Sequence, residues 1–259
     1  MERTRVYRVD DDAFSAWGLT RDDALELEGV MASLNAYPQL RSRLADPSYE
    51  EKAKLDLVST LWGTRISQAS CKALAHIAQS AENSAHLIAL IHDAIVRTLL
   101  MTSEDLSTTG DELFSVCQLI TSDSELHAAI QARSRSVEQR YELIASLIRG
   151  KVTQTTCECV RIAFASPYRD LASALEEYAR YASELSGNQF VVATVAKMPT
   201  DTQRERLMTR LSSSLGGSVH VHYIVDPQVL GGMKLTWSQQ MIDATVRAMT
   251  DDLHQRIGE

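Results

Sequence analysis

The histidines that could bind a metal ion are His220 and His222, which lie two residues apart in the segment SVHVHYIVD (218–226). Alternating apolar residues in this segment predict a β-strand, and residues two apart on a strand share one face. Imidazole is a common ligand of zinc and related metals, so the pair could form part of a metal site. Two ligands do not complete such a site, however, and we expect His220 and His222 on an exposed polar face opposite Val219 and Val221.

Two acidic residues could act in catalysis or ion binding. Glu82 lies four residues before His86 on a predicted helix, and such a pair is far more often a solvent-facing ion pair than a metal site. Asp226 could be a catalytic acid, but an aspartate directly before a proline, here Pro227, more often begins a turn. The sequence therefore assigns neither acidic residue a catalytic role.

The cysteines and the known catalytic motifs add no active site. Cys71, Cys117, Cys157 and Cys159 lie in apolar stretches of predicted helix, and the pair Cys157 and Cys159 has no second pair to complete a zinc site. We expect reduced, mostly buried thiols. The sequence lacks the glycine-rich phosphate loops, the nucleophile elbow and the H-E-x-x-H zinc motif. A binding or structural role is favoured over an enzyme, with no cofactor, no metal and no catalytic residue.

Length and charge narrow the class of protein further. The chain has 259 residues, 44% hydrophobic and 23% charged, which is typical of a folded globular protein of one or two domains. Its formal net charge of 26 − 34 = −8 argues against nucleic-acid binding and against a polybasic membrane-surface protein. Asp10, Asp11 and Asp12 occupy the place of a signal peptide's apolar segment, and no uncharged apolar run is long enough to span a bilayer. We expect a soluble, intracellular protein with no direct membrane insertion.

Glycine content and charge both change near residue 187. Residues 1–186 contain 5 glycines and carry the whole net charge, whereas residues 187–259 contain 6 glycines and equal numbers of basic and acidic residues, 7 of each. A glycine-poor, acidic part followed by a glycine-richer, neutral part predicts a domain boundary. Together with the repeat described next, this change predicts domains at residues 1–105, 106–186 and 187–259.

The part of the chain before residue 187 contains an internal repeat at an offset of 86. An ungapped overlay of residues 22–80 on residues 108–166 gives ten identities, which include Leu27/Leu113, Leu40/Leu126, Leu57/Leu143, Leu61/Leu147 and Cys71/Cys157. Apolar periodicity shared by two helical segments could produce some of these matches. A register kept without gaps over the whole overlay makes a duplication the better interpretation.

Each copy has the periodicity of amphipathic helices. In the second copy Leu113, Val116, Cys117 and Ile120 recur at i, i+3, i+4 and i+7. Long helices are expected near residues 85–100 and 168–186. In the polar linker TSEDLSTTGDE, Thr109 could cap the next helix, with Glu112 at the capping-box spacing. Two consecutive helical bundles are the simplest architecture.

The segment from residue 187 onward shows strand periodicity instead. FVVATVA (190–196), SVHVHYIVD (218–226) and MKLTW (233–237) predict three strands, and the segment after Pro199 predicts an amphipathic helix ended by two glycines. MIDATVRAMTDDLHQRI (241–257) predicts a closing helix. The expected fold class is therefore mainly α: two tandem copies of a helical bundle followed by a small α/β module of order β-α-β-β-α.

One C-terminal segment resembles a known family. VDPQVLGGMKL, followed about ten residues later by MIDATV, is similar to the C-terminal signature of the δ subunit of F-type ATP synthase, whose mitochondrial equivalent is the oligomycin-sensitivity-conferring protein. The sequence departs from the family at Ala244 and Thr245, where Gly-Ser is usual, and at Ser238 and Gln239, where a Gly-Asp turn is usual. The matching positions are Asp226, Pro227, Leu230, Gly231, Gly232, Ile242, Asp243 and Val246.

The resemblance extends over residues 110–259, because SELHAAIQARSRSVEQRYELIASLI also looks like a segment of the family's helical domain. The first copy, residues 1–109, is additional to a minimal δ subunit. Long δ subunits with a duplicated helical region are a pattern associated with actinobacteria.

The resemblance implies a non-catalytic subunit of the peripheral stalk, which resists rotation of the catalytic head. The helical part would bind N-terminal segments of the α subunits, and the C-terminal module would bind the C-terminal helix of the membrane-anchored b subunit. The protein would then lie peripherally at the cytoplasmic face of the cell membrane. On the last predicted helix, Arg247, Asp251 and His254 are candidate partner contacts.

Two alternatives from other classes remain open. The chain could be a helical-repeat adaptor unrelated to ATP synthase, whose small module binds a ligand, and it would then function away from membranes. It could also be an enzyme with a site between its domains that uses Asp226, His220 and His222, and it would then bind a metal or turn over a substrate. Neighbouring genes for other ATP synthase subunits, or recovery from solubilised membranes, would distinguish these alternatives from the stalk protein.

Overall fold

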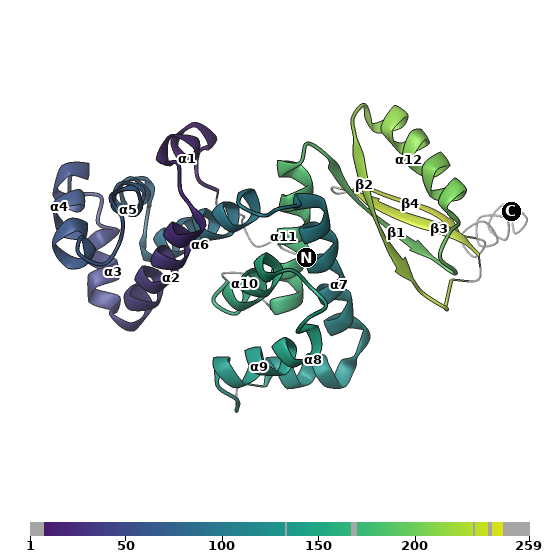
Figure 1. Ribbon diagram of the computed structural model, residues 1–259, viewed down its shortest axis with the longest axis horizontal. Coiled ribbons are helices and arrows are strands. Elements are labelled where there is room, and N and C mark those ends of the chain that lie inside the picture. The colour runs from purple at the N-terminus through teal and green to yellow at the C-terminus, as the bar shows by residue number, and fades with distance from the viewer. Residues whose placement is uncertain (1–7, 133, 167–169, 230, 238–239, 246–259) are drawn as a thin grey trace, which may run out of the picture.

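The computed structural model describes residues 8–132, 134–166, 170–229, 231–237 and 240–245. Within these residues the chain forms a long helical region followed by a small module with a four-stranded sheet, and the two lie at opposite ends of an elongated molecule (Figure 1). The mainly α fold class with a small α/β module is confirmed. Five of the candidate residues named from the sequence lie outside the described residues: Leu230, Val246, Arg247, Asp251 and His254.

The duplication appears directly in the bounds of the helices. After α1 (Asp11–Trp17), each helix of the first copy has a counterpart at an offset of 86; Glu51–Trp62, for example, corresponds to Val137–Ile148 without any shift. The first copy comprises α2 (Arg21–Ala36), α3 (Pro38–Leu44), α4 (Glu51–Trp62), α5 (Gln68–Ser80) and α6 (Ser84–Met101). The second comprises α7 (Leu106–Ser122), α8 (Ser124–Gln131), α9 (Val137–Ile148), α10 (Gln154–Ala163) and α11 (Leu171–Leu185).

The start of α7 differs from the sequence-based expectation. Asp105 is the N-cap, and its carboxylate accepts hydrogen bonds from the backbone N–H groups of Ser107 and Thr108. Thr109 lies inside the helix and is buried, so it does not cap α7. The carboxylate of Asp105 caps the helix four residues earlier than the capping box predicted from Thr109 and Glu112.

Glu112 instead ties the first helix of the second copy to the fourth. Its Oε2 accepts hydrogen bonds from the N–H of Thr153 at 2.8 Å and from the hydroxyls of Thr153 and Thr156 at 2.7 and 2.6 Å. Glu26 does the same in the first copy, where it accepts from the N–H of Ser67 and the hydroxyl of Ser70, both at 2.8 Å. At the offset of 86, Glu26, Ser67 and Ser70 correspond to Glu112, Thr153 and Thr156. This polar connection therefore occurs in both copies.

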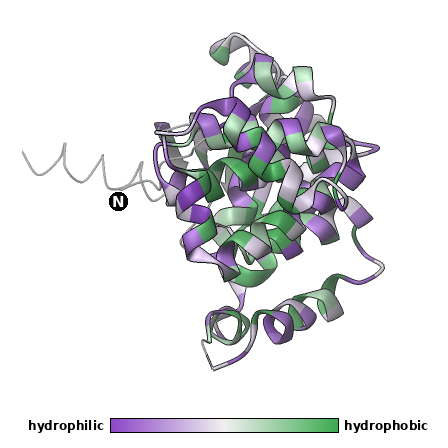
Figure 2. Ribbon diagram, turned by 90° about the vertical axis from the view of Figure 1, so that its left-hand side faces the viewer, coloured by the Kyte–Doolittle hydropathy of each residue, from purple (hydrophilic) through white to green (hydrophobic). Residues whose placement is uncertain are grey.

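The two copies share one apolar core, which extends from Val9 through α2 and α6 into α7 and α11. Apolar residues fill the interior of this region and polar ones lie around it (Figure 2). At the centre, the Tyr178 hydroxyl lies 2.7 Å from Nε2 of His92, and burial lowers the pKa of His92 to about 4. Residues 92 and 178 differ by 86, so a position touches its own counterpart. The interface between the copies thus includes one pair of equivalent positions.

Helix α6 confirms the long helix expected near residues 85–100. Among the described residues it is the helix that passes a length and composition test for crossing a membrane, with 18 residues. It is 67% buried inside the protein, and Leu87, Ile91, Ile95 and Leu99 belong to the shared core. Its apolar surface is thus covered by packing inside the protein, mainly on α2 of its own copy and also on α10 of the second copy.

The small module is a four-stranded mixed sheet covered on one face by a helix. Its elements are β1 (Gln189–Val195), α12 (Asp201–Leu215), β2 (Val219–Val225), β3 (Gly232–Trp237) and β4 (Gln240–Thr245), with strand order β2-β1-β3-β4. β1 and β2 are parallel and joined through α12, whereas β3 and β4 are antiparallel to their neighbours. Leu207, Leu211 and Leu215 of α12 pack on Val191 and Leu235 of the sheet.

The prediction of a closing helix from residue 241 is wrong for its first turn. Residues 240–245 form β4, which pairs with β3 from Gly232↔Thr245 to Trp237↔Gln240. Pairing with the edge of the sheet provides hydrogen-bond partners for backbone N–H and C=O groups of this segment. These hydrogen bonds to β3 override the local preference for a helix that the periodicity indicates. The rest of the predicted helix, residues 246–257, lies outside the described residues.

Removing the carboxylate of Glu112 tests the polar connection inside each copy. We expect Glu112→Ala to lower the free energy of unfolding by about 1–3 kcal/mol, because the buried hydroxyl of Thr156 loses its acceptor, as do the hydroxyl and the backbone N–H of the exposed Thr153. Denaturant unfolding measures the change. The control is Glu104→Ala, which alters an exposed glutamate before α7 and should change stability by less than about 0.5 kcal/mol. Equal effects of the two substitutions would contradict the assignment.

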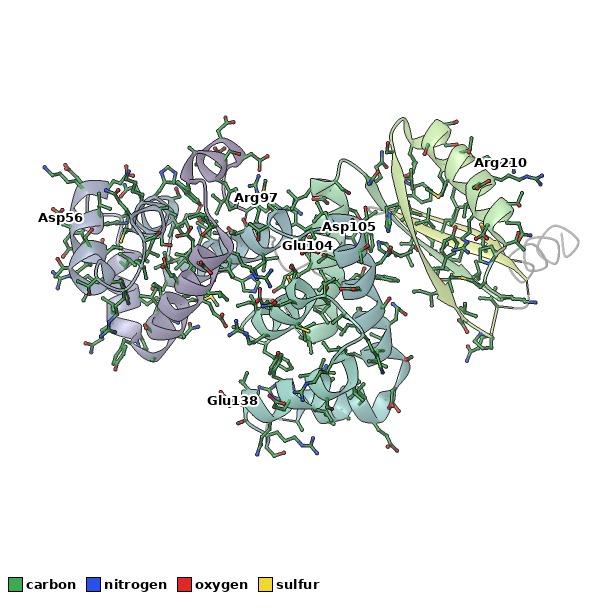
Figure 3. The ribbon with its side chains drawn as sticks, viewed as in Figure 1. Asp56, Arg97, Glu104, Asp105, Glu138 and Arg210 are labelled. Atoms are coloured by element: carbon green, nitrogen blue, oxygen red, sulfur yellow. The ribbon has the colours of Figure 1, made fainter. Side chains whose placement is uncertain are left out.

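Asp93 should lower the free energy of unfolding as the pH rises, because its pKa is higher in the folded protein than in the unfolded chain. Burial raises the pKa of Asp93 from 3.8 to about 6, although the N–H of Val9 donates to its carboxylate at 2.9 Å. Because the folded state holds the proton more tightly, this residue stabilises the protein below about pH 4, and that contribution is lost as the pH rises through about 6. Arg97, with its guanidinium stacked on Phe14, lies nearby at the centre of the molecule (Figure 3).

We expect the difference in unfolding free energy between the natural chain and Asp93→Asn to change by about 3 kcal/mol between pH 4 and pH 7, in favour of the variant at pH 7. The comparison with Asn removes the contributions of all other carboxylates, which titrate in both proteins. Denaturant unfolding at four pH values measures it. A difference that stays constant with pH would show that Asp93 ionises as an ordinary carboxyl.

Candidate functional site

The C-terminal motif forms one end of the sheet. The N–H of Asp226 donates to the C=O of Val195 at 2.9 Å, its carboxylate accepts from the N–H of Gln228 at 2.9 Å, and its C=O accepts from the N–H of Val229 at 3.1 Å. These bonds close a turn directly after β2, as an aspartate before Pro227 predicts. The carboxylate of Asp226 thus has a structural partner at the end of the strand.

Gly232 begins β3 at the same end of the sheet. Its φ of 79° lies in the left-handed region, where a side chain on Cβ causes strain, and Gly231 before it has φ 158°. In the sheet, Gly232 pairs with Thr245, the last described residue of β4, and Val195 pairs with Met233. The Asp-Pro turn, the paired glycines and the end of β4 are therefore neighbours in space, although they lie well apart in the sequence.

The motif also supplies exposed apolar surface. Ile242 is 51% exposed and its neighbour Met241 is 59% exposed, both on the edge strand β4. Ile242 pairs with the buried Leu235 of β3, and Asp243 stands opposite Lys234. An isoleucine that remains half exposed on an edge strand is available for contact with a partner chain.

The second feature is the joint between the helical region and the module. Asp111 of α7 lies with Oδ1 2.8 Å from Nε2 of His220 and 3.1 Å from Nδ1 of His222. The His222 side chain is 1% exposed and packs against the rings of Phe114 and Phe190, with centroid distances of 4.6 and 4.7 Å. The expected exposed polar face is thus wrong for His222, because the helical region covers that face of the sheet at β1 and β2.

Electrostatics fix the charge pattern at this joint. Burial opposes ionisation of Asp111, but hydrogen bonds from His220 and His222 hold its pKa well below the ordinary value. The hydrogen bond to Asp111 raises the pKa of His220, whereas burial lowers the pKa of His222. Nε2 of His222 is buried without a hydrogen-bond partner among the described residues. The arrangement therefore favours a charged His220 beside a carboxylate and a neutral His222.

The catalytic trio considered from the sequence does not assemble. Asp226 follows the end of β2 and is four residues beyond His222, which corresponds to about 13 Å along a strand. Elsewhere, the N–H of Glu82 donates to Nδ1 of His86, so the link between these two residues runs through the backbone of Glu82.

The cysteines have the character of structural thiols. All four are free, and burial raises the pKa of Cys159 to about 12. Cys157 is half-buried, and burial is also the largest cause of its raised pKa. A high thiol pKa keeps these side chains in the unreactive protonated form.

Asp111 is the functional candidate that was not predicted from the sequence. It lies far before His220 in the chain, and an aspartate in the first turns of an amphipathic helix has no local feature that sets it apart. Its counterpart in the first copy is the apolar Leu25. This difference between the two copies could have drawn attention to Asp111.

Comparison with known proteins gives a consistent result over most of the chain. Residues 94–257 match the family model described as ATP synthase delta (OSCP) subunit. The ATP synthase subunit delta of Streptomyces avermitilis is 30% identical over 237 residues, covering 90% of this chain and 87% of that protein, and the one from Streptomyces coelicolor is 29% identical over 237 residues, covering 90% and 86%. A chain in the cryo-EM structure of the Toxoplasma gondii mitochondrial ATP synthase hexamer aligns at 15% identity over 65% of this chain and 96% of that one, with a TM-score of 0.36.

The length of these alignments shows that the relatives contain the first helical copy too. An alignment over 90% of the chain must include more than half of the residues before position 110. The family model, in contrast, begins at residue 94, inside α6. The first copy therefore belongs to the long form of the relatives and precedes the part that the family model describes.

The left-handed backbone at Gly232 makes a substitution there costly. We expect Gly232→Val to lower the free energy of unfolding by about 1–3 kcal/mol, because valine at a φ of 79° is strained whatever space surrounds it. Thermal unfolding of the full chain measures the loss. The matched control is Gly217→Ala, where an added Cβ meets only Nε2 of Gln189 at 3.6 Å, an ordinary contact. Equal stability of Gly232→Val and Gly217→Ala would refute this role of Gly232.

Proposed function

Because the chain belongs to the ATP synthase delta (OSCP) subunit family, we propose that it is the part of the peripheral stalk that links the catalytic α/β head to the membrane-anchored b subunits. In this role the protein resists rotation of the head and catalyses no reaction itself. It lies at the cytoplasmic face of the cell membrane and is attached there through the complex.

The separation of two different surfaces on one continuous body supports this proposal. The first-copy helices and the α/β module lie at opposite ends of the molecule, and Asp56 on α4 and Arg210 on α12 mark these ends (Figure 3). A stalk protein must hold two partners at a distance and transmit torque between them. The single apolar core across both helical copies, which also includes Phe190 of the module, suits such mechanical continuity.

The partners follow from the chemistry of the two ends. We assign N-terminal segments of the α subunits to the helical region, because packed helices are a surface type that binds amphipathic helices. We assign the C-terminal helix of the b subunit to the module. Large apolar side chains that are about half exposed support a protein contact there: Met198, Met208, Val225, Met241 and Ile242.

An adaptor unrelated to membranes is the competing function. Family membership over residues 94–257 weighs against it. Recovery of the full chain with solubilised membranes, together with the α and b subunits, is expected for a stalk protein. Recovery without either of these subunits would favour the adaptor.

Binding of the b subunit to the module is tested with a single substitution and a deletion. We expect Ile242→Glu to weaken binding of a C-terminal fragment of b to the full chain by at least about tenfold, since a charge replaces apolar contact surface at an interface. Deleting residues 246–259, which contain Arg247, Asp251 and His254, should also weaken it. Calorimetric titration measures affinity, and thermal unfolding shows whether the fold is kept.

The control is Tyr37→Glu, which alters a 66% exposed aromatic side chain on the helical region. It should leave affinity for the b fragment unchanged. If Ile242→Glu and the deletion both keep full affinity while the protein stays folded, the module does not bind the b subunit.

A further inference from the structure

The joint between α7 and β2 brings together three side chains with the chemistry of a metal site. We propose that Asp111, His220 and His222 bind one divalent zinc-class cation, which fastens the α/β module to the helical region. The three ligand atoms come from two elements that are far apart in sequence, and all lie within 4.8 Å of one another. This proposal is independent of the partners assigned above.

The distances fit the geometry that zinc requires. Zinc binds imidazole nitrogen and carboxylate oxygen at about 2.0–2.2 Å in a tetrahedron, so neighbouring ligand atoms lie about 3.3 Å apart. Oδ1 of Asp111 is 2.8 Å from Nε2 of His220 and 3.1 Å from Nδ1 of His222. A cation that replaces the shared protons therefore needs Oδ1 of Asp111 to move only a few tenths of an ångström away from each nitrogen, while the two nitrogens, which lie within 4.8 Å of one another, adjust to the same spacing.

The combination of ligands is selective for this class of ion. Two imidazoles and one carboxylate suit zinc and its neighbours among the transition metals, whereas calcium and magnesium prefer oxygen ligands alone. His220 and His222 lie on the same face of β2 because they are two residues apart, and that face meets α7. Three protein ligands leave a fourth position for water.

The cluster is bordered by aromatic side chains on one side and by solvent on the other. Phe114 and Phe190 enclose the His222 ring on the inner side. On the outer side the Asp111 side chain is 53% exposed and that of His220 is 23% exposed, which leaves a path for an ion. An apolar shell on one side and solvent on the other is the usual environment of a bound zinc ion.

Nearby charges permit a cation. Asp105 adds negative potential at His220. The positive charge of Arg180 acts on His222, but its guanidinium is paired with Glu176 at 3.1 Å and with Glu177 at 3.3 Å and stacks on Phe190. The two glutamates compensate the arginine.

Titration of the chelator-treated full chain with ZnCl2 tests the site. We expect one zinc ion per chain with a dissociation constant in the low micromolar range or tighter, and a rise in thermal stability on binding. Asp111→Asn and His220→Gln should each weaken binding by at least about tenfold, because each removes one ligand of three. Cobalt in place of zinc should give the absorption of a tetrahedral site, which both variants should lose.

The matched control is His76→Gln, because Nδ1 of His76 lies 3.8 Å from a carboxylate oxygen of Glu51 in an exposed pair. Zinc binding should be unchanged in this variant. Circular dichroism of each variant confirms that the fold is kept. Absence of binding in the micromolar range, or binding that survives both Asp111→Asn and His220→Gln, would overturn the proposal and leave the cluster as an ion pair.

Discussion

Burial of helix α6 against the second copy is the interaction on which the rest of the structure depends. Within the first copy this long apolar helix packs mainly on α2, and packing against α10 and α11 removes a further part of its surface from water. The contact between His92 and Tyr178, which are equivalent in the repeat, lies in this interface. The duplication thus produced one body with a common core. Such a body can carry load from one end to the other in a way that two domains on a flexible linker cannot.

Hydrogen bonds of polar side chains join the helices within each copy. Glu26 and Glu112 each accept hydrogen bonds from the start of the fourth helix of their copy, and this fixes two helices whose packing is otherwise non-directional. Lys54 is almost fully buried, yet its ammonium group donates to the C=O of Ala78 at 2.7 Å. Hydrogen bonds of this kind add little net stability, but breaking one leaves an unsatisfied buried group, so they select one arrangement of helices over others.

The joint at Asp111 has a different character, because it connects a helix to a sheet instead of one copy to its duplicate. Phe190 of β1 joins the helical core, and Phe114 of α7 packs against His222 of β2. The module is therefore attached through both apolar and charged contacts at β1 and β2, which leaves β4 at the far edge of the sheet for a partner. This separation between the inner joint and the outer edge of the sheet would suit the attachment to the b subunit proposed above.

The sequence by itself determined the helices before residue 187 and the repeat, since helical periodicity and the offset of 86 are encoded in the order of residues alone. It also placed the turn at Asp226, because a turn of this kind depends on neighbours in the chain. The pairing of residues 240–245 with β3 was decided only by the tertiary structure, since an edge strand's hydrogen bonds come from another segment and can override local helical preference. The same holds for the burial of His222 and its link to Asp111, which is distant in the sequence: the helical region covers one face of the sheet, and no periodicity within β2 can report what lies on that face.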